Sequence, residues 1–541
     1  MRRGPLLAST KLVCLVFFLV AVVLPLARML IHLSDTDVAA IITAPRFAQA
    51  LTNSLLVSVS AALISLAIAS ILAWAVTRTN LPGKRLWSIL FTLPMLIPSI
   101  SHGMGLVVLF GANGFLTRLL GIDGSIYGFW GIVTGSVLYS FPVGFLMISD
   151  VLRYEDATPY EAADVLGISR LRQFAAITVP YMRKPMIAAI FTVFTLIITD
   201  YGVPLMIGGQ CITLPVMMYQ DVVGLLDFGK GSVIGLVLLV PALIAFAIDL
   251  LTRDRGNAGF VLKSFTLRHN VRRDLAALVA SVLVALFVLL PIASFVVLTF
   301  VSHYPNDLTL TLANIGRAFG MKAGTYLLNS VIIACSVALI GCAVSFIVAY
   351  FTARSSGRLS HALHLFSIVS LAIPGLVLGL SYVLFFKGTL LYGSLAILVL
   401  ANMMHFFSSP YLMIYNTLGK LNANLEAVGA TLGVGRFAIV RDVLLPQSRL
   451  TLVEMFTYFF VNSMMTISAV SFLANTATRP LSLMIPSFEA TMMLECAAFV
   501  SLLILVVNLA LSGGMGVLKK VLGKRSGGTV GAVVEKKGAV A

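Results

Sequence analysis

The chain has 541 residues, of which 59% belong to the hydrophobic set and 11% are Asp, Glu, Lys or Arg, and its formal net charge is +16. Soluble domains usually contain about 25% charged residues, so there are too few charges here to cover the surface of a soluble globule. Together with a mean hydropathy of +1.02, this excludes a soluble enzyme, a disordered scaffold and a disulfide-rich secreted module. The composition predicts an integral membrane protein.

Twelve apolar runs are long enough to cross a membrane, which takes about 20 residues in a helix. The first run follows Arg2, Arg3 and Lys11 as in a signal peptide, but no convincing small-residue cleavage site follows it, so we expect an uncleaved helix. A barrel would instead show strands with alternating polarity. We therefore predict an all-α polytopic membrane protein. Its predicted spans are 12–33, 52–76, 87–110, 129–150, 186–206, 231–250, 275–301, 326–350, 363–386, 394–417, 451–472 and 497–513.

The basic residues form short clusters between alternate apolar runs and do not gather in one patch. Of the 37 Lys and Arg residues, 29 lie at the N-terminus, in alternate loops or in the tail, and six of them lie in the segment 251–274. Loops rich in Lys and Arg face the cytoplasm. The charge therefore indicates membrane topology and not nucleic-acid binding. We expect a bacterial inner-membrane protein with both termini and the segment 251–274 in the cytoplasm.

The two halves of the sequence repeat one another. Leu51–Ser54 opens a predicted helix that ends near Arg78, and Leu327–Ser330 opens another that ends near Arg354, each 276 positions later. Six predicted spans separate the copies, so the repeats are parallel, and repeats of this kind surround a shared path. We predict a first domain over 1–250, a cytoplasmic linker over 251–274, a second domain over 275–513 and a basic, disordered tail over 514–541.

The longest predicted cytoplasmic loop of each half carries one motif, within about 151–185 and about 418–450. A Glu and small residues suit a short helix that a partner can approach closely, and a Gly permits the turn with positive φ that ends such a helix. A Pro thirteen residues after the Gly begins the next span. Such an elbow can sit in a groove of a soluble partner, whereas a single copy could be a mere connector. The motif residues are Glu161, Ala162, Ala163, Gly167 and Pro180 in the first half, and Glu426, Ala427, Gly433 and Pro446 in the second.

On these residues the sequence resembles the permease subunits of binding-protein-dependent ABC importers, whose loops of this type dock onto a cytoplasmic ATPase. The resemblance covers nearly the whole chain and is to the fused type with two permease domains, as in iron(III), thiamine and phosphonate importers. It implies an ATPase homodimer that binds the ATP, an extracytoplasmic solute-binding protein, and a small solute such as iron(III), thiamine, a phosphonate or a polyamine. The second loop departs from the pattern, because Glu426 lies seven residues before its Gly, Glu161 lies six before, and Gly429 replaces an Ala.

The sequence offers little else for chemistry. Gly224–Lys230 matches a phosphate-binding loop up to its Lys, but Gly231 stands where a Ser or Thr would hold Mg²⁺. The five cysteines form no CxxC pair and indicate no metal site. We therefore expect a transport subunit that is not an enzyme and holds no cofactor. Asp200 is the one candidate for the translocation path, because carboxylates near membrane depth often line pathways, although a capping Asp at the interface is the ordinary alternative.

A secondary transporter of the major facilitator architecture is the alternative function, since it also has twelve spans in two halves. That class requires buried ionisable groups for ion coupling, whereas nearly all acids here lie at span ends or in loops. It also leaves the paired elbows unexplained. A channel or a structural membrane protein has no positive feature in this sequence. The sequence therefore favours an ATP-driven importer.

Overall fold

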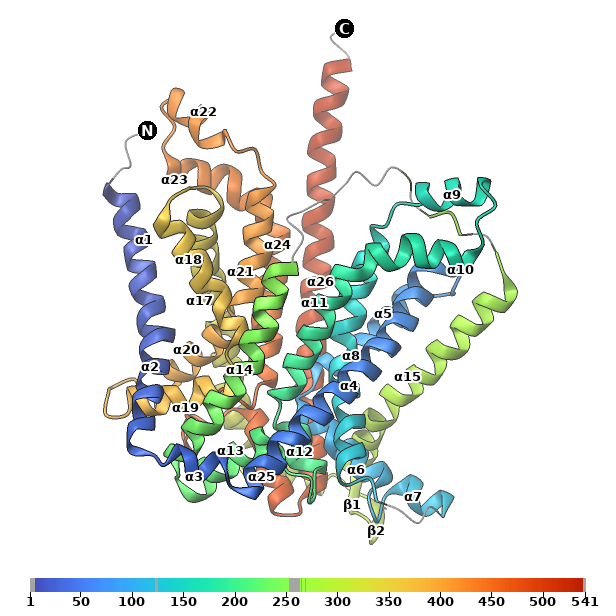
Figure 1. Ribbon diagram of the computed structural model, residues 1–541, viewed down its shortest axis with the longest axis vertical. Coiled ribbons are helices and arrows are strands. Elements are labelled where there is room, and N and C mark those ends of the chain that lie inside the picture. Colours follow the sequence, from blue (N-terminus) through green and yellow to red (C-terminus); the bar gives the residue numbers. More distant parts are fainter. Residues whose placement is uncertain (1–4, 122–124, 253–262, 264, 268, 539–541) are drawn as a thin grey trace. The chain divides into compact units, whose positions relative to one another are not determined.

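A computed structural model describes the backbone of residues 5–121, 125–252, 263, 265–267 and 269–538. Its contacts group the chain into two compact units. Unit 1 comprises Met1–His32, Lys322–Leu483 and Leu503–Ala541, and unit 2 comprises Leu33–Met321 and Met484–Leu502. Helices dominate both units, and the described residues contain one two-stranded sheet, in which β1 pairs antiparallel with β2 in unit 2 (Figure 1).

Unit 2 contains the helices of the first half except the first two, together with the segment that follows the linker and one short helix near the end of the chain. Its elements are α3 (Val38–Ile42), α4 (Pro45–Arg78), α5 (Lys84–Thr92), α6 (Ser99–Phe110), α7 (Phe115–Leu120), α8 (Phe129–Arg153), α9 (Thr158–Val165), α10 (Arg170–Gln173), α11 (Val179–Ile198), α12 (Gly202–Ile207), α13 (Leu214–Tyr219), α14 (Phe228–Thr252), α15 (Val271–Phe300), β1 (Val301–His303), β2 (Asp307–Leu310), α16 (Ala313–Gly320) and α25 (Met484–Ala490).

Unit 1 combines the first two helices of the chain with helices of the second half. Its elements are α1 (Pro5–Phe18), α2 (Leu24–Ile31), α17 (Ala323–Ala353), α18 (Arg358–Val369), α19 (Gly375–Phe386), α20 (Leu395–Phe406), α21 (Ser408–Gly419), α22 (Leu425–Thr431), α23 (Arg436–Ile439) and α24 (Leu445–Met465). The last helix, α26 (Leu494–Gly538), begins in unit 2 and continues into unit 1.

Small residues bring the core helices of each unit close together. In unit 2, a Cβ on Gly144 of α8 would lie 3.2 Å from the Cβ of Ala69 on α4, and the hydroxyls of Ser65 and Ser140 are 2.8 Å apart across the same interface. In unit 1, a Cβ on Gly341 of α17 would lie 2.8 Å from a ring carbon of Phe459 on α24. Close backbone approach and interhelical hydrogen bonds are the usual way in which membrane helices pack.

The all-α polytopic membrane fold is confirmed. Among the described residues, nine helices are long and apolar enough to cross a membrane, and two bent helix pairs raise the number to eleven. The remaining predicted span, 451–472, corresponds to the 21-residue helix α24, which carries Arg449 and Glu454 and is not among those eleven. Each predicted span thus has a helical counterpart, although 87–110 is divided between α5 and α6.

Two of the predicted spans are interrupted at equivalent prolines. Pro98 is the N-cap residue of α6, and Pro374, at the same place in the second repeat, is the N-cap residue of α19. The second break turns the chain by 110°. Proline lacks the backbone donor that a continuous helix needs and restricts the residue before it, so the chain starts a new helix at each of these positions.

The compact units group the chain differently from the two domains expected from the repeats. α1 and α2 belong with the second-half helices, and α15 belongs with the first-half helices. The buried hydroxyl of Tyr382 on α19 donates to the carbonyl of Ala21, 2.6 Å away, which fixes the start of the chain within unit 1. The division at 251–274 describes the sequence repeats and stays a prediction.

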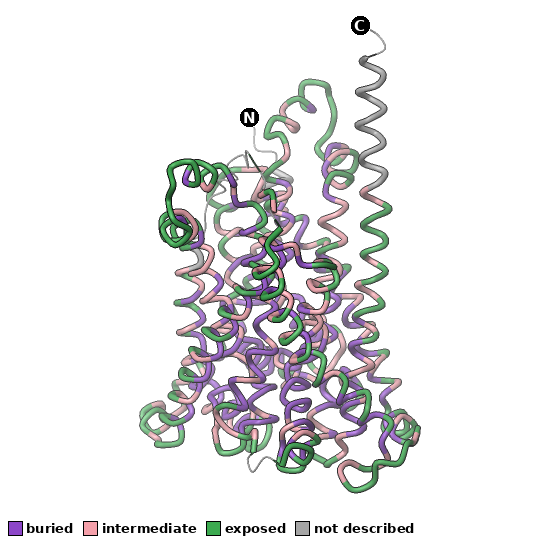
Figure 2. The backbone as a smooth tube through the Cα atoms, turned by 90° about the vertical axis from the view of Figure 1, so that its right-hand side faces the viewer, coloured by how far each residue is buried: buried purple, intermediate pink, exposed green. Residues whose placement is uncertain are grey.

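The tail expected to be disordered from residue 514 is helical instead, because α26 continues to Gly538. Near the end of its described side chains α26 contacts α24, where Arg449 donates to the carbonyl of Leu522 at 2.8 Å and Lys519 pairs with Glu454. Val517 and Val521, in the last turns of the candidate membrane span that ends at Gly523, are exposed, and the part of the helix just below its grey end is largely green in Figure 2. The charged residues of the tail do not prevent a helix, since Lys and Glu are good helix formers.

Candidate functional site

Elbow 1, residues 158–180, is a short helix followed by a turn and a second helix. α9 carries Glu161, Ala162 and Ala163 and ends before Gly167, whose φ is +67°. The chain then enters α10, a π-helical turn and α11, with Pro180 in the first turn of α11. The left-handed Gly turn and the Pro at the helix start have the geometry that the motif predicts.

Elbow 2, residues 425–446, repeats this arrangement in unit 1. α22 carries Glu426 and Ala427, and Gly433 follows with φ of +70°. A short α23 and a π-helical turn lead into α24, where Pro446 occupies the first turn. The two elbows therefore share one backbone path, although their sequences differ.

Packing explains why Gly429 stands in elbow 2 where the motif has an Ala. Gly429 is buried, and a Cβ there would lie 2.4 Å from Cδ1 of Ile439, which packs across the turn. The equivalent pair in elbow 1 is Ala163 and Gln173, both buried. Gln173 donates to the carbonyl of Ile168 at 2.8 Å. Elbow 1 thus pairs an Ala with a polar Gln at this position, whereas elbow 2 pairs a Gly with an apolar Ile.

The two motif glutamates have different roles in their elbows. Glu426 forms a two-pronged ion pair with Arg354, with Nε–Oε1 at 2.9 Å and Nη2–Oε2 at 2.5 Å. The Arg354 side chain is only 4% exposed and that of Glu426 16% exposed, and the hydrogen bonds to Glu426 raise the pKa of Arg354. Glu161 instead lies on the surface, 48% exposed, 2.8 Å from Nζ of Lys263. Glu426 therefore braces elbow 2 from inside, whereas Glu161 faces outward.

Tyr160 occupies in elbow 1 the position that Glu426 occupies in elbow 2. Its hydroxyl donates to Glu155 at 2.5 Å, and Glu155 in turn pairs with Arg78 at 2.5 Å. Burial and the hydrogen bond to Glu155 raise the pKa of the Tyr160 phenol, so it stays neutral. Elbow 1 thus reaches the end of α4 through a Tyr–Glu–Arg chain, and this explains why the motif glutamate is free to face outward.

Large apolar side chains are exposed at matching positions of both elbows. Leu171 is 83% exposed and Phe437, at the equivalent position, is 77% exposed. Leu166 and Leu432 form a second matching pair, 75% and 73% exposed. Exposed apolar surface of this kind marks sites of contact with a protein partner or with the membrane. These residues were not predicted from the motif, although their recurrence 266 residues apart, like that of Gly167 and Gly433, is visible in the sequence.

Asp200 lies two residues before α12, and its side chain binds the first turn of that helix. Its carboxylate accepts a hydrogen bond from the backbone N–H of Val203 at 3.0 Å and one from the hydroxyl of Ser99 at 2.6 Å. Both bonds are those of a structural carboxylate that joins α12 to the start of α6. The assignment of Asp200 to the translocation path stays a prediction.

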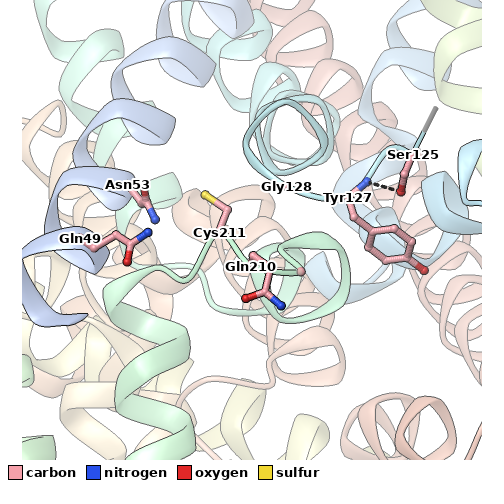
Figure 3. A pocket seen from close by; sticks show the side chains of 8 residues that line it. Gln49, Asn53, Ser125, Tyr127, Gly128, Gln210 and Cys211 are labelled. Carbon is pink, nitrogen blue, oxygen red and sulfur yellow. Dashed lines mark hydrogen bonds between the residues drawn. The ribbon is translucent and has the colours of Figure 1, made fainter. Parts of the chain in front are cut away.

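A shallow pocket of about 540 Å³ lies at the end of unit 2 opposite elbow 1. Figure 3 shows Gln49 and Asn53 of α4 on one side, Ser125 and Tyr127 on the other, and Gln210 and Cys211 between them. Among the described residues, its lining contains amides and hydroxyls but no carboxylate, and Asp200 is not part of it. No predicted site residue contributes to it. Among the described residues, no group of three or more His, Cys, Asp or Glu side chains could hold a metal ion.

The family comparison matches each half of the chain separately. The description "Binding-protein-dependent transport system inner membrane component" fits residues 65–253 and again residues 341–523, and each match contains one elbow. The chain belongs to this family. It is therefore a multi-pass inner-membrane permease subunit with two permease domains fused in one polypeptide, and its relatives are transport subunits.

Individual relatives include ferric, sulfate and molybdenum permeases. A Haemophilus influenzae protein, provisionally named as a ferric transport system permease, is 25% identical over 88% of this chain and 79% of its own length. The ferric transport system permease protein of Actinobacillus pleuropneumoniae is 24% identical over 80% of this chain and 65% of its own length. The molybdenum transport system permease protein of Haemophilus influenzae is 33% identical over 32% of this chain and 78% of its own length.

Proposed function

We propose that this protein is the membrane permease of an ABC importer and that its two elbows dock onto a separate cytoplasmic ATPase homodimer. The observation that carries the proposal is the recurrence of exposed apolar side chains, Leu171 and Phe437, on two elbows of the same backbone path. An ATPase groove would bury these side chains. Hydrolysis of ATP by that partner would then move the elbows and the spans that follow them.

An extracytoplasmic solute-binding protein would deliver the solute, in keeping with the family to which the chain belongs. The elbows, the linker and both termini would face the cytoplasm, because the basic residues concentrate in these segments. We further propose iron(III) as the solute. The two ferric permeases described above each match more than three quarters of this chain, whereas the molybdenum relative matches about one third of it.

The experiment is a purification of the full chain together with the ATPase and the solute-binding protein encoded beside it, followed by reconstitution in proteoliposomes. We expect the ATPase to co-purify and radiolabelled iron(III) uptake to require ATP. Uptake that instead follows an imposed proton or sodium gradient without ATP would identify a secondary transporter. ATP-dependent uptake of another solute, such as thiamine, would support the proposed importer function and refute only iron(III) as the substrate.

A further inference from the structure

Arg78, at the end of α4, holds three separate parts of unit 2 together. Its guanidinium donates to the carbonyl of Leu152 at the end of α8, 2.7 Å away, and pairs with Glu155 at 2.5 Å. The same guanidinium lies over the ring of Phe265, with 3.7 Å between its central carbon and the ring centroid. Phe265 comes from the linker between the two halves, so the linker contacts the core of the first half.

The linker also contacts elbow 1 directly. The rings of Phe265 and Tyr160 meet edge to face with centroids 5.1 Å apart. The carbonyl of Lys263 accepts a hydrogen bond from the N–H of Ala157 at 3.0 Å, and Nζ of Lys263 lies 2.8 Å from Glu161. Phe265 is thus placed between the end of α4 and the first turn of the elbow.

A second contact ties the end of the linker to the turn after α4. Asp274, in the first turn of α15, accepts a hydrogen bond from the N–H of Asn80 at 3.1 Å and pairs with Arg273 at 2.8 Å. The linker therefore meets the same end of α4 at both Phe265 and Asp274. This arrangement goes beyond what a passive tether between two domains requires.

Elbow 2 has its own brace within the second half. Arg354, at the repeat position of Arg78, donates to the carbonyls of Leu421 and Asn422 at 2.9 and 2.7 Å and forms the buried ion pair with Glu426 described above. In elbow 1, the neutral Tyr160 stands in place of that glutamate. Elbow 1 therefore has two ties to α4, the Tyr160–Glu155–Arg78 chain and the contacts of Phe265 with Arg78 and Tyr160. Elbow 2 is tied to α17 by Arg354 directly.

We propose that Phe265 and Lys263 of the linker are positioning residues of elbow 1, which fasten the elbow to α4 so that movement of the elbow reaches the span. This inference rests on the proposed coupling function. The Lys263–Glu161 pair is about half exposed and contributes little in water. Of the two linker residues, Phe265 contributes more and acts beside the Tyr160–Glu155–Arg78 chain, because an aromatic ring between a guanidinium and a second ring gains both a cation–π and an aromatic contact.

The test uses the full chain with its ATPase and solute-binding protein in proteoliposomes. The variants are Phe265→Ala and Phe265→Tyr, and the matched control is Thr266→Ala, an exposed neighbour in the same segment. The measurements are ATPase co-purification and the stimulation of ATP hydrolysis by the solute-binding protein. Stimulation reports whether a signal crosses the permease, and it does not depend on the identity of the solute.

For Phe265→Ala we expect normal ATPase association and a loss of stimulation by about fivefold, in keeping with the usual strength of these two contacts. Phe265→Tyr keeps the ring and should retain stimulation, as should Thr266→Ala. If Phe265→Ala reaches the membrane poorly, Phe265→Leu replaces it, since Leu keeps apolar bulk without a π face.

Three results would overturn the inference. Wild-type stimulation in Phe265→Ala would mean that the linker does not fasten the elbow. Equal loss in Phe265→Tyr would mean that the ring contact is not the cause. Loss of ATPase association in Phe265→Ala would make the linker a docking surface and not a positioning element. Failure of the wild-type chain to bind the ATPase would instead refute the proposed function itself.

Discussion

At Gly167 and Gly433 the backbone is left-handed, and the space beside both residues is open, because a Cβ added at either position would meet no atom within 4 Å beyond its chain neighbours. The requirement for Gly is therefore conformational and not steric. A β-branched residue in this region of backbone space costs about 1–3 kcal/mol, whereas Asn tolerates it comparatively well.

We therefore expect Gly167→Val and Gly433→Val to reach the membrane at normal levels but to lose ATPase association and transport. The strain acts on the turn between the two short helices and leaves the spans intact. The measurement is ATPase pull-down beside uptake. Gly167→Asn and Gly433→Asn are the controls and should remain close to wild type. Normal association of both Val variants would show that the loops are only connectors.

The ion pair between Arg354 and Glu426 supports a second prediction at the residue scale. Arg354→Ala would leave the mostly buried Glu426 carboxylate without its partner, and loss of one member of a buried pair costs up to about 3–5 kcal/mol. We expect elbow 2 to become sensitive to limited proteolysis. Arg441→Ala is the matched control, because its pair with Asp442 in the same elbow is exposed and should contribute little. Equal sensitivity of the two variants would contradict the bracing role.

Substitution of Glu161 and substitution of Glu426 should consequently have different effects on the protein. The sequence motif predicts that Glu161→Ala is the more damaging change, since Glu426 is out of register with its Gly. Exposed on elbow 1, Glu161 can offer a charge-assisted hydrogen bond to a partner. We expect Glu161→Ala to weaken ATPase association without loosening elbow 1, and Glu426→Ala to loosen elbow 2. Pull-down and proteolysis of the same samples distinguish the two outcomes, and identical behaviour would refute the distinction.

Each elbow presents apolar surface that the rest of its own unit does not cover. Leu171 and Phe437 are the most exposed matching pair. Burial of a Leu or Phe side chain contributes about 1.5–3 kcal/mol, and 1.4 kcal/mol corresponds to a tenfold change in affinity. The docking surface should therefore depend on these two side chains more than on the motif alanines.

We expect Leu171→Ser or Phe437→Ser to weaken ATPase association by about tenfold or more, measured as the dissociation constant of the detergent-solubilised complex. Leu390→Ser is the control, because Leu390 is fully exposed but lies in the loop between α19 and α20, away from elbow 2. Unchanged affinity in both elbow variants would remove the apolar surface from the docking site.

For the whole molecule, the alternation of basic loops predicts the topology. We expect Lys263→Cys and Ala541→Cys to be protected from a membrane-impermeant thiol reagent in intact cells and to be labelled after the membrane is opened. Leu390→Cys should be labelled from outside, because the predicted topology places its loop on the opposite side from the linker. Labelling of Lys263 or Ala541 from outside would invert the proposed orientation and place the elbows away from a cytoplasmic ATPase.

The helices, the repeats and the elbow geometry were accessible from the sequence, because each depends on local properties. Apolar length defines a span, Pro98 and Pro374 restrict the chain at equivalent positions, and Gly167 and Gly433 permit a turn that few other residues adopt. Such signals act over a few residues and survive in both copies. The tail after residue 514 is the exception, since its charge suggested disorder although its residues form a helix through Gly538.

The tertiary structure decided which residues hold the elbows in place. Glu426 pairs with Arg354, 72 residues away, and Tyr160 packs against Phe265 of the linker. It also decided that α1 joins the second-half helices in unit 1 and α15 the first-half helices in unit 2. These contacts join residues far apart in the chain, and their energies depend on burial and geometry that exist only after the helices pack. The sequence by itself thus determined what the elements are, and packing determined how each elbow is connected to its spans.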